Sequence, residues 1–168
     1  SGGFDGWRPR LYGTSLYDST VAIVGMGAVG QALAKLLSGF RTKILYVDSR
    51  DLGDKSDWIL GATRSSLKNA LAKSDFVVLT LPLKPDTQNL FDADRIGLMK
   101  PGAILINPGR GSLVDEEAVA DALEVGHLGG YGADVFAFED WARYDRPKSI
   151  SSRLRAQNSV TCFTPHLG

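Results

Sequence analysis

Residues 21–30 read VAIVGMGAVG, an apolar run followed at once by a Gly-x-Gly-x-x-Gly pattern. The run has the composition of a buried strand, and the glycines stand where a helix would begin. Gly25 permits a tight turn between the two, Gly27 lets a pyrophosphate approach the backbone, and Gly30 lets the helix pack closely on the sheet. Free N–H groups at the N-terminus of that helix favour phosphate groups. The stretch therefore predicts a dinucleotide-binding turn.

An amphipathic pattern continues beyond the glycines. Its apolar members recur at three- and four-residue spacing and are Val29, Ala32, Leu33, Leu36, Leu37 and Phe40. This spacing places them on one face of a helix, which we expect to pack on the sheet. A second helix is predicted after Ser65 or Ser66. A third is predicted to begin near Asp115 and to end at Gly126, because glycine is a common residue at helix ends.

Short apolar runs recur along the chain and predict the strands. They lie at residues 21–24, 44–47, 76–79 and 103–106, with weaker runs at 134–136 and 160–163. Runs that do not alternate with polar residues are typical of parallel strands covered on both faces. Because they alternate with helical patterns, we expect an α/β fold with a doubly wound parallel sheet, a Rossmann-type domain. We assign residues 20–168 to this domain and residues 1–19 to an approach segment.

Asp48 follows the run at 44–47, where a dinucleotide fingerprint carries an acid that binds the ribose hydroxyls. Its carboxylate would repel the 2′-phosphate of NADP, so the residue favours NAD. Arg50 lies two residues further on and offers that phosphate a partial counter-charge. Folds that bind FAD or S-adenosylmethionine also begin with this glycine pattern. The simpler alternative is a glycine-rich turn that binds another ligand or none.

Three polar residues follow later runs of the chain. Arg110 lies in the sequence NPGRG at 107–111, Glu139 comes after the run at 134–136, and His166 follows the last run. Open α/β sheets bind ligands at the carboxyl ends of their strands. An arginine there can clamp an oxyanion through two hydrogen bonds, and a histidine titrates in the range that proton transfer needs. Each residue alone is more often structural, but their order along the chain indicates a catalytic set.

Composition and charge exclude several classes of function. With 168 residues, of which 43% are hydrophobic and 23% charged, the chain fits one globular domain. Lys plus Arg (19) balances Asp plus Glu (19), which argues against nucleic acid or an anionic membrane as a partner. No apolar run approaches the roughly 18 residues of a membrane span. Cys162 is the single cysteine, so no internal disulfide or metal cluster is expected; we predict a core position and a cytoplasmic location.

These motifs together resemble the D-isomer-specific 2-hydroxyacid dehydrogenase family. The glycine pattern, Asp48, NPGRG at 107–111, GADVF at 132–136 with Glu139, and TPH at 164–166 carry the likeness. The resemblance implies NAD as cofactor, a small anionic substrate and a homodimer. It also implies that Arg110 polarises the substrate oxyanion, that His166 is the general acid or base, and that Glu139 hydrogen-bonds His166 and favours its charged form.

The same resemblance implies a set of cofactor contacts. They are Ala28 and Val29 at the phosphate turn, Pro82 and Thr87 beside the adenosine, Pro108, Gly109 and Arg110 near the nicotinamide together with His166, and Asp134 at the carboxamide. No metal is expected.

Within the family, the run EDWAR at 139–143 with DRP at 145–147 is most similar to the phosphonate (phosphite) dehydrogenases, as is GWRP at 6–9. Most family members place a proline after the glutamate, where this chain has Asp140. This likeness implies hydride transfer from phosphite to NAD, giving phosphate and NADH. One alternative is a glyoxylate or hydroxypyruvate reductase. Another, from a different class, is a non-catalytic NAD-sensing interaction module, against which the joint presence of Arg110, Glu139 and His166 counts.

Two expectations concern the surroundings of the site. Trp141 and Arg143 are expected either to shape the substrate entrance or to form a subunit contact. Family members build a separate substrate domain from segments before and after the cofactor domain. We therefore expect this chain to fold and to bind NAD weakly. We also expect it to turn over little substrate alone, because its catalytic groups would face solvent rather than a closed cleft.

Overall fold

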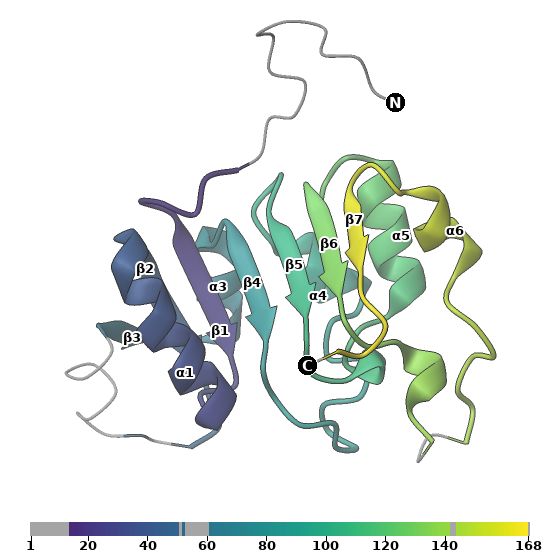
Figure 1. The fold of residues 1–168 in the computed structure, drawn as a ribbon, viewed down its shortest axis with the longest axis horizontal. Coiled ribbons are helices and arrows are strands. Elements are labelled where there is room, and N and C mark those ends of the chain that lie inside the picture. Colours follow the sequence, from purple (N-terminus) through teal and green to yellow (C-terminus); the bar gives the residue numbers. More distant parts are fainter. Residues whose placement is uncertain (1–13, 51, 53–60, 142–143, 168) are drawn as a thin grey trace, which may run out of the picture.

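The computed structural model describes residues 14–50, 52, 61–141 and 144–167, which form a sheet covered by helices (Figure 1). The strands are β1 (Thr20–Val24), β2 (Lys43–Val47), β3 (Ala62–Arg64), β4 (Phe76–Leu79), β5 (Ile104–Asn107), β6 (Gly130–Ala133) and β7 (Thr161–Phe163). Their order is β3-β2-β1-β4-β5-β6-β7, and every neighbouring pair is parallel. The predicted α/β fold with a doubly wound parallel sheet is confirmed.

Helices and one-turn 3₁₀ segments connect the strands. The helices are α1 (Ala28–Leu37), α3 (Leu67–Lys73), α4 (Ala93–Gly97), α5 (Glu116–Glu124) and α6 (Ser152–Ala156). The 3₁₀ segments are η1 (Ser38–Phe40), η2 (Gly111–Leu113) and η3 (Ala137–Glu139). The predicted helix starts at residues 66 and 115 are confirmed, since Ser66 accepts a hydrogen bond from Asn69 N and Asp115 from Glu117 N and Ala118 N.

Alternate residues of the central strands enter two hydrophobic clusters, one on each face of the sheet. On β1, Val21 and Ile23 pack with α1, whereas Ala22 and Val24 belong to the cluster that includes α3, α4, α5 and α6. Because successive side chains of a strand point to opposite faces, both faces of the central strands are buried. Because all the strands are parallel, their carboxyl ends lie side by side at one end of the sheet, the carboxyl edge.

The face of α1 that packs on the sheet differs from the predicted one. Val29, Leu36 and Phe40 are exposed, and the buried stripe of α1 is Gly30, Ala34 and Leu37. A Cβ atom at residue 30 would lie only 2.2 Å from the carbonyl oxygen of Gly25, so the helix comes too close to β1 for a side chain there. Of the predicted face, Leu37 is buried and Leu33 packs against the cluster, so the prediction was wrong only for the other residues. Gly30 and Ala34 were missed because small residues occupy the positions where the helix comes closest to the sheet.

Three strand-level expectations also need correction. The strand expected at 134–136 is wrong, because β6 comes earlier, at Gly130–Ala133. Two glycines lower the strand propensity of that segment and hid it from the sequence pattern. Strand β3 was not predicted at all. Cys162 is exposed rather than buried, because it points away from the face of Phe163, toward a face whose cluster extends no farther than β5.

Candidate cofactor site

The glycine turn lies where the order of the strands reverses. β1 has β2 on one side and β4 on the other, and the chain continues outward from both (Figure 1). In open α/β sheets this switch point leaves a crevice at the carboxyl ends of the strands. The loops after β1, β2 and β4 line a cavity of about 730 Å³ there. Of the predicted cofactor-binding residues, Gly25, Gly27, Asp48, Pro82 and Thr87 line it.

Backbone geometry explains the glycines of the turn. Gly25 has a φ of +100°, and a Cβ there would lie 2.8 Å from the backbone N of Leu81. Gly27 is the N-cap residue of α1 and has no side chain with which to cap the helix. A Cβ at Gly27 would meet nothing within 4 Å, so its absence leaves open space beside the first-turn N–H groups. This space and these donors suit a pyrophosphate.

The Asp48 carboxylate is largely buried at the end of β2 and is fully engaged. Its Oδ2 accepts hydrogen bonds from Met26 N at 2.8 Å and from Arg50 Nη2 at 3.2 Å, and its Oδ1 accepts from Arg50 N at 2.9 Å and Nε at 3.1 Å. The hydrogen bond from the Arg50 side chain is the largest influence, and it lowers the pKa of Asp48 from 3.8 to about 2. The group is ionised at neutral pH and stays so into the acidic range, and an ionised carboxylate accepts hydrogen bonds through both of its oxygens.

A second cavity, of about 440 Å³, adjoins the first, because Thr80, Leu81 and Pro82 line both. Val29, Pro108, Gly109 and Arg110 line this cavity as well, and their contacts with the phosphates and the nicotinamide stay predictions. Together the two cavities follow the carboxyl edge of the sheet from β2 to β5. Such an elongated space suits a dinucleotide better than a mononucleotide.

Two polar residues that support these walls escaped the sequence reasoning as functional residues. The Thr80 hydroxyl donates to the carbonyl oxygen of Gly25 at 2.5 Å, which ties the loop after β4 to the glycine turn. Asn107 is fully buried; its Oδ1 accepts from Gly109 N at 3.1 Å and its Nδ2 donates to the carbonyl oxygen of Arg110 at 2.8 Å. Both residues directly follow an apolar run in the sequence. That position, at the carboxyl end of a strand, could have identified them as residues of the site.

Glu139 and His166 lie in contact beside the carboxyl edge. Glu139 ends η3, which follows β6, and its Oε2 lies 2.7 Å from His166 Nδ1. His166 has a φ of +55°, rare for a residue other than glycine, and its backbone N donates to the carbonyl oxygen of Asp134 at 2.9 Å. The imidazole is half exposed, with the carboxylate on its Nδ1 side. Its Nε2 is then the atom available for proton transfer.

Arg110, Glu139 and His166 follow the neighbouring strands β5, β6 and β7 in turn. The Arg110 side chain is exposed, and its Nη1 donates to the carbonyl oxygen of Gly109 at 2.8 Å. A cationic guanidinium and an imidazole held by a carboxylate can together bind an anion and move a proton. The three catalytic assignments themselves stay predictions.

Four predicted cofactor contacts lie differently from the rest. In the described part of the chain, Ala28, Gly30, Asp134 and His166 line neither of the two cavities. The Asp134 carboxylate accepts hydrogen bonds from the Thr164 hydroxyl and, at 2.9 Å, from Leu167 N. It holds the turn that carries His166, and its contact with a carboxamide stays a prediction.

Other predicted residues lie around or outside this site. Trp141 is 82% exposed, and the Arg146 guanidinium lies over its ring at 4.4 Å from the centroid. Arg143 and the motif at 6–9 lie outside the described residues. In the described part of the chain, no group of His, Cys, Asp or Glu side chains could hold a metal ion, and no helix is long and apolar enough to cross a membrane.

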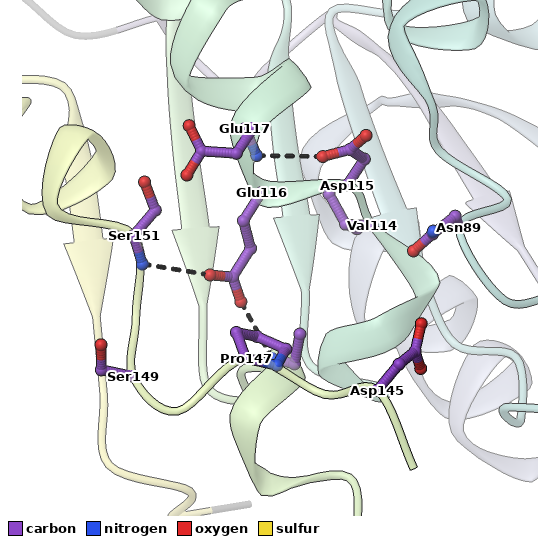
Figure 2. A pocket seen from close by; sticks show the side chains of 10 residues that line it. Asn89, Val114, Asp115, Glu116, Glu117, Asp145, Pro147, Ser149 and Ser151 are labelled. Carbon is purple, nitrogen blue, oxygen red and sulfur yellow. Dashed lines mark hydrogen bonds between the residues drawn. The ribbon is translucent and has the colours of Figure 1, made fainter. Parts of the chain in front are cut away.

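A third cavity, of about 370 Å³, lies beside the N-terminus of α5 and has acidic walls (Figure 2). Glu116 is its most buried carboxylate, and burial raises the pKa of this group. Its oxygens accept from Ala137 N at 2.9 Å and from Ser151 N at 3.4 Å, so they join η3 and α6 to α5. Glu116 therefore has a structural role behind the Glu139 loop.

Comparison with known proteins places these features in a family. Residues 3–168 match the model described as D-isomer specific 2-hydroxyacid dehydrogenase, NAD binding domain. A glyoxylate reductase of Pyrococcus furiosus is 39% identical over 163 residues, which are 96% of this chain and 46% of that protein. Glyoxylate/hydroxypyruvate reductase B of Escherichia coli O6:K15:H31 is 40% identical over 161 residues, 95% of this chain and 47% of that protein.

Solved structures agree with the sequence relatives. A putative D-isomer specific 2-hydroxyacid dehydrogenase from Polaromonas superimposes with a TM-score of 0.85 at 32% identity, over 98% of this chain and 49% of that one. The NAD-complexed enzyme from Lactobacillus delbrueckii gives a TM-score of 0.80 at 30% identity, over 96% and 50%. The chain spans about half the length of the curated relatives it matches.

Proposed function

The chain belongs to the D-isomer-specific 2-hydroxyacid dehydrogenase family, and we propose that it supplies the cofactor half of an enzyme acting on a small anion. The family match is to an NAD-binding domain, so NAD is the cofactor. We take residues 20–168 as that domain. The observation that carries the proposal is the 2.7 Å contact between Glu139 and His166, on the same carboxyl edge as Arg110 and the two cavities.

The residues of the first cavity fit the adenosine diphosphate part of NAD. The open space at Gly27 and the uncapped N-terminus of α1 suit its phosphates, and the ionised Asp48 suits the ribose hydroxyls. When bound, NAD supplies the hydride acceptor or donor of the reaction. Arg50 already engages Asp48, so the ribose shares that carboxylate with Arg50 or displaces it.

Proton transfer is the task proposed for the catalytic residues. In reduction of a 2-keto acid, His166 gives a proton to the carbonyl oxygen while the carbonyl carbon accepts hydride, and Arg110 holds the substrate oxyanion. Glu139 stabilises the protonated imidazole and fixes its orientation. The relatives' names, glyoxylate reductase and glyoxylate/hydroxypyruvate reductase B, support this substrate class.

Phosphite is a second candidate substrate, favoured by the sequence from residue 139 to 147. In that reaction water attacks phosphorus, hydride leaves phosphorus for NAD, and His166 takes the proton of the water. Arg110 holds the phosphite oxygens. Both candidates use the same three residues, so only turnover with the individual substrates separates them.

Calorimetric titration of the chain with NAD and with NADP tests the cofactor assignment. We expect NAD to bind at least tenfold more tightly, because the Asp48 carboxylate repels a 2′-phosphate, and Asp48→Asn to reduce this preference. Asp121→Asn removes an exposed carboxylate of α5 and serves as the control. Tighter binding of NADP by the unsubstituted chain would contradict the role of Asp48.

Turnover needs the rest of the family's length, so it is tested in a rebuilt enzyme. We would put this chain in place of the matching domain of the Pyrococcus furiosus glyoxylate reductase and assay glyoxylate, hydroxypyruvate and phosphite. His166→Asn should lower kcat about 100-fold or more. His127→Asn changes the other histidine, which contacts the carbonyl oxygen of Ile96, and should leave kcat within about twofold.

Two results would change the proposal. NAD binding without turnover of any of the three substrates would favour a non-catalytic NAD-sensing module, in which His166→Asn leaves partner binding unaltered. Rapid production of NADH from phosphite by the 168-residue chain alone would contradict its dependence on a second domain. The oligomer is likewise a proposal, and sedimentation of the chain would detect the expected homodimer.

A further inference from the structure

Asp140 connects the two loops that carry Arg110 and Glu139. It follows Glu139 directly and is only 8% exposed. Its Oδ2 accepts a hydrogen bond from the backbone N of Ser112 at 2.6 Å. Ser112 is the second residue of η2, which begins immediately after Arg110. The side chain therefore bridges the loop after β5 and the loop after β6.

Backbone packing shows how closely these loops approach one another. A Cβ at Gly111 would lie 1.8 Å from the carbonyl carbon of Phe136 and 2.2 Å from the backbone N of Ala137. A side chain cannot fit between them, so η2 and η3 are in direct backbone contact. A directed hydrogen bond at the margin of this contact fixes one loop relative to the other.

The chemistry of the bond makes it a strong constraint. A carboxylate that accepts from a backbone N–H forms a charge-assisted hydrogen bond, about twice as strong as a neutral one. A buried carboxylate also loses its solvation, so leaving it unpaired is costly and the loop cannot easily move away.

Other hydrogen bonds also hold the two loops. The carbonyl oxygen of Ser112 accepts from Asn89 N at 2.8 Å, whereas Ala137 N donates to Glu116 on α5. Glu116 begins α5 three residues after η2, so its bond to Ala137 N also joins the two loops, but farther along the chain from Arg110 than Ser112 is. Asp140 supplies the tie nearer to Arg110, and its loss would free the position of Arg110 relative to the Glu139–His166 pair more than that of α5.

We propose that Asp140 is a positioning residue, which sets the Arg110 loop and the wall of the second cavity against the Glu139 loop. This proposal rests on the proposed function. Pro108, Gly109 and Arg110 line the second cavity, just before the anchored Ser112. A loop that must be ordered when a ligand binds lowers the affinity for that ligand. Asp140 thus acts on the nicotinamide side of the site and leaves the adenosine side unchanged.

The test compares two ligands that differ only in the nicotinamide group. NAD and ADP-ribose are titrated into the 168-residue chain, its variants Asp140→Ala and Asp140→Asn, and the control Asp121→Ala. We expect Asp140→Ala to weaken NAD about fivefold and ADP-ribose less than twofold. Asp140→Asn keeps an acceptor oxygen, so its affinity for NAD should lie between that of the unsubstituted chain and that of Asp140→Ala. In amide exchange, the Ser112 N–H should exchange at least tenfold faster in Asp140→Ala.

Several outcomes would overturn the role. Unchanged NAD affinity, or an equal loss for NAD and ADP-ribose, would reduce Asp140 to a merely structural residue. If Asp140→Ala does not fold, Asp140→Asn provides the test instead: its loss of affinity for NAD is compared with its loss of affinity for ADP-ribose. If the unsubstituted chain binds neither ligand, the proposed function fails. Unchanged exchange of Ser112 in a folded variant would separately exclude the loop tie.

Discussion

Gly30 shows how one missing side chain sets the geometry of the whole cofactor turn. It lets α1 lie against β1, and the same approach places the N-terminus of the helix over the first cavity. Val29 and Leu36 of α1 lie on the other side of the helix and are exposed. At this scale the distance between two backbones decides which residue types fit.

Substitution Gly30→Ala should destabilise the domain by about 1–3 kcal/mol, because a Cβ at 2.2 Å from a backbone oxygen forces the helix and strand apart. Gly39→Ala is the matched control, since a Cβ at Gly39 meets nothing within 4 Å. It should change the stability by less than about 0.5 kcal/mol. Urea unfolding of both variants measures the difference, and equal stabilities would contradict the packing argument.

The lowered pKa of Asp48 predicts that part of the free energy of unfolding depends on pH in the acidic range. Its pKa of about 2 in the folded chain lies below the ordinary 3.8, so its contribution is fully present above about pH 4 and is lost as the pH falls toward 2. The shift corresponds to about 2–3 kcal/mol at most, and to about 1 kcal/mol after allowance for solvent around the exposed Arg50. Between pH 5 and 2, the free energy of unfolding should fall less steeply with decreasing pH in Asp48→Asn than in the unsubstituted chain.

An unchanged slope in Asp48→Asn would show that the Arg50 pair does not contribute. Asp18→Asn removes a carboxylate whose ion pair with Arg41 is exposed on both sides. This control should alter the stability by less than about 0.5 kcal/mol.

At the scale of elements, helix ends were predicted better than strands. The N-cap at Asp115 and the glycine after α5 depend on local backbone chemistry, and Gly126 indeed has a φ of +71°. Strand assignment depends on neighbours instead. β3 has two exposed residues out of three, and β6 contains two glycines, so neither shows an apolar run.

Removal of the α5 cap should weaken this element. Asp115 accepts from Glu117 N at 3.0 Å and from Ala118 N at 3.3 Å, so Asp115→Ala leaves two donors without that acceptor. We expect a loss of about 1 kcal/mol in the free energy of unfolding. Asp115→Asn keeps a capping oxygen and should lose much less. A larger loss for asparagine than for alanine in thermal unfolding would contradict a capping role.

For the molecule as a whole, the sequence predicted the parallel sheet, apart from β3 and the position of β6, and the end of the sheet at which the two cavities lie. The glycine pattern and the uninterrupted runs carry that information locally. The supporting residues Thr80, Asn107 and Asp140 were not assigned a function, because their partners are backbone groups of other loops. Such pairings depend on the folded arrangement and leave little trace in the order of residue types.

Binding of NAD should stabilise the entire domain, since both cavities are walled by loops of several strands. At a concentration 100 times its Kd, a ligand adds about 2.7 kcal/mol, which raises the Tm of a chain this size by roughly 5–10 °C. A thermal scan with and without NAD measures the shift, and Asp48→Asn should show a smaller one at the same NAD concentration. No shift at any NAD concentration would contradict a preformed site.

The two outer strands, β3 and β7, have three residues each and are the shortest of the sheet. An edge strand exposes unpaired backbone groups that can recruit a foreign strand, and a short edge offers few of them. The sheet is thus protected against growth by strand addition and against the aggregation that follows from it. We therefore expect two copies of the domain to associate through side chains on helices and loops rather than by extending the sheet from one copy into the next.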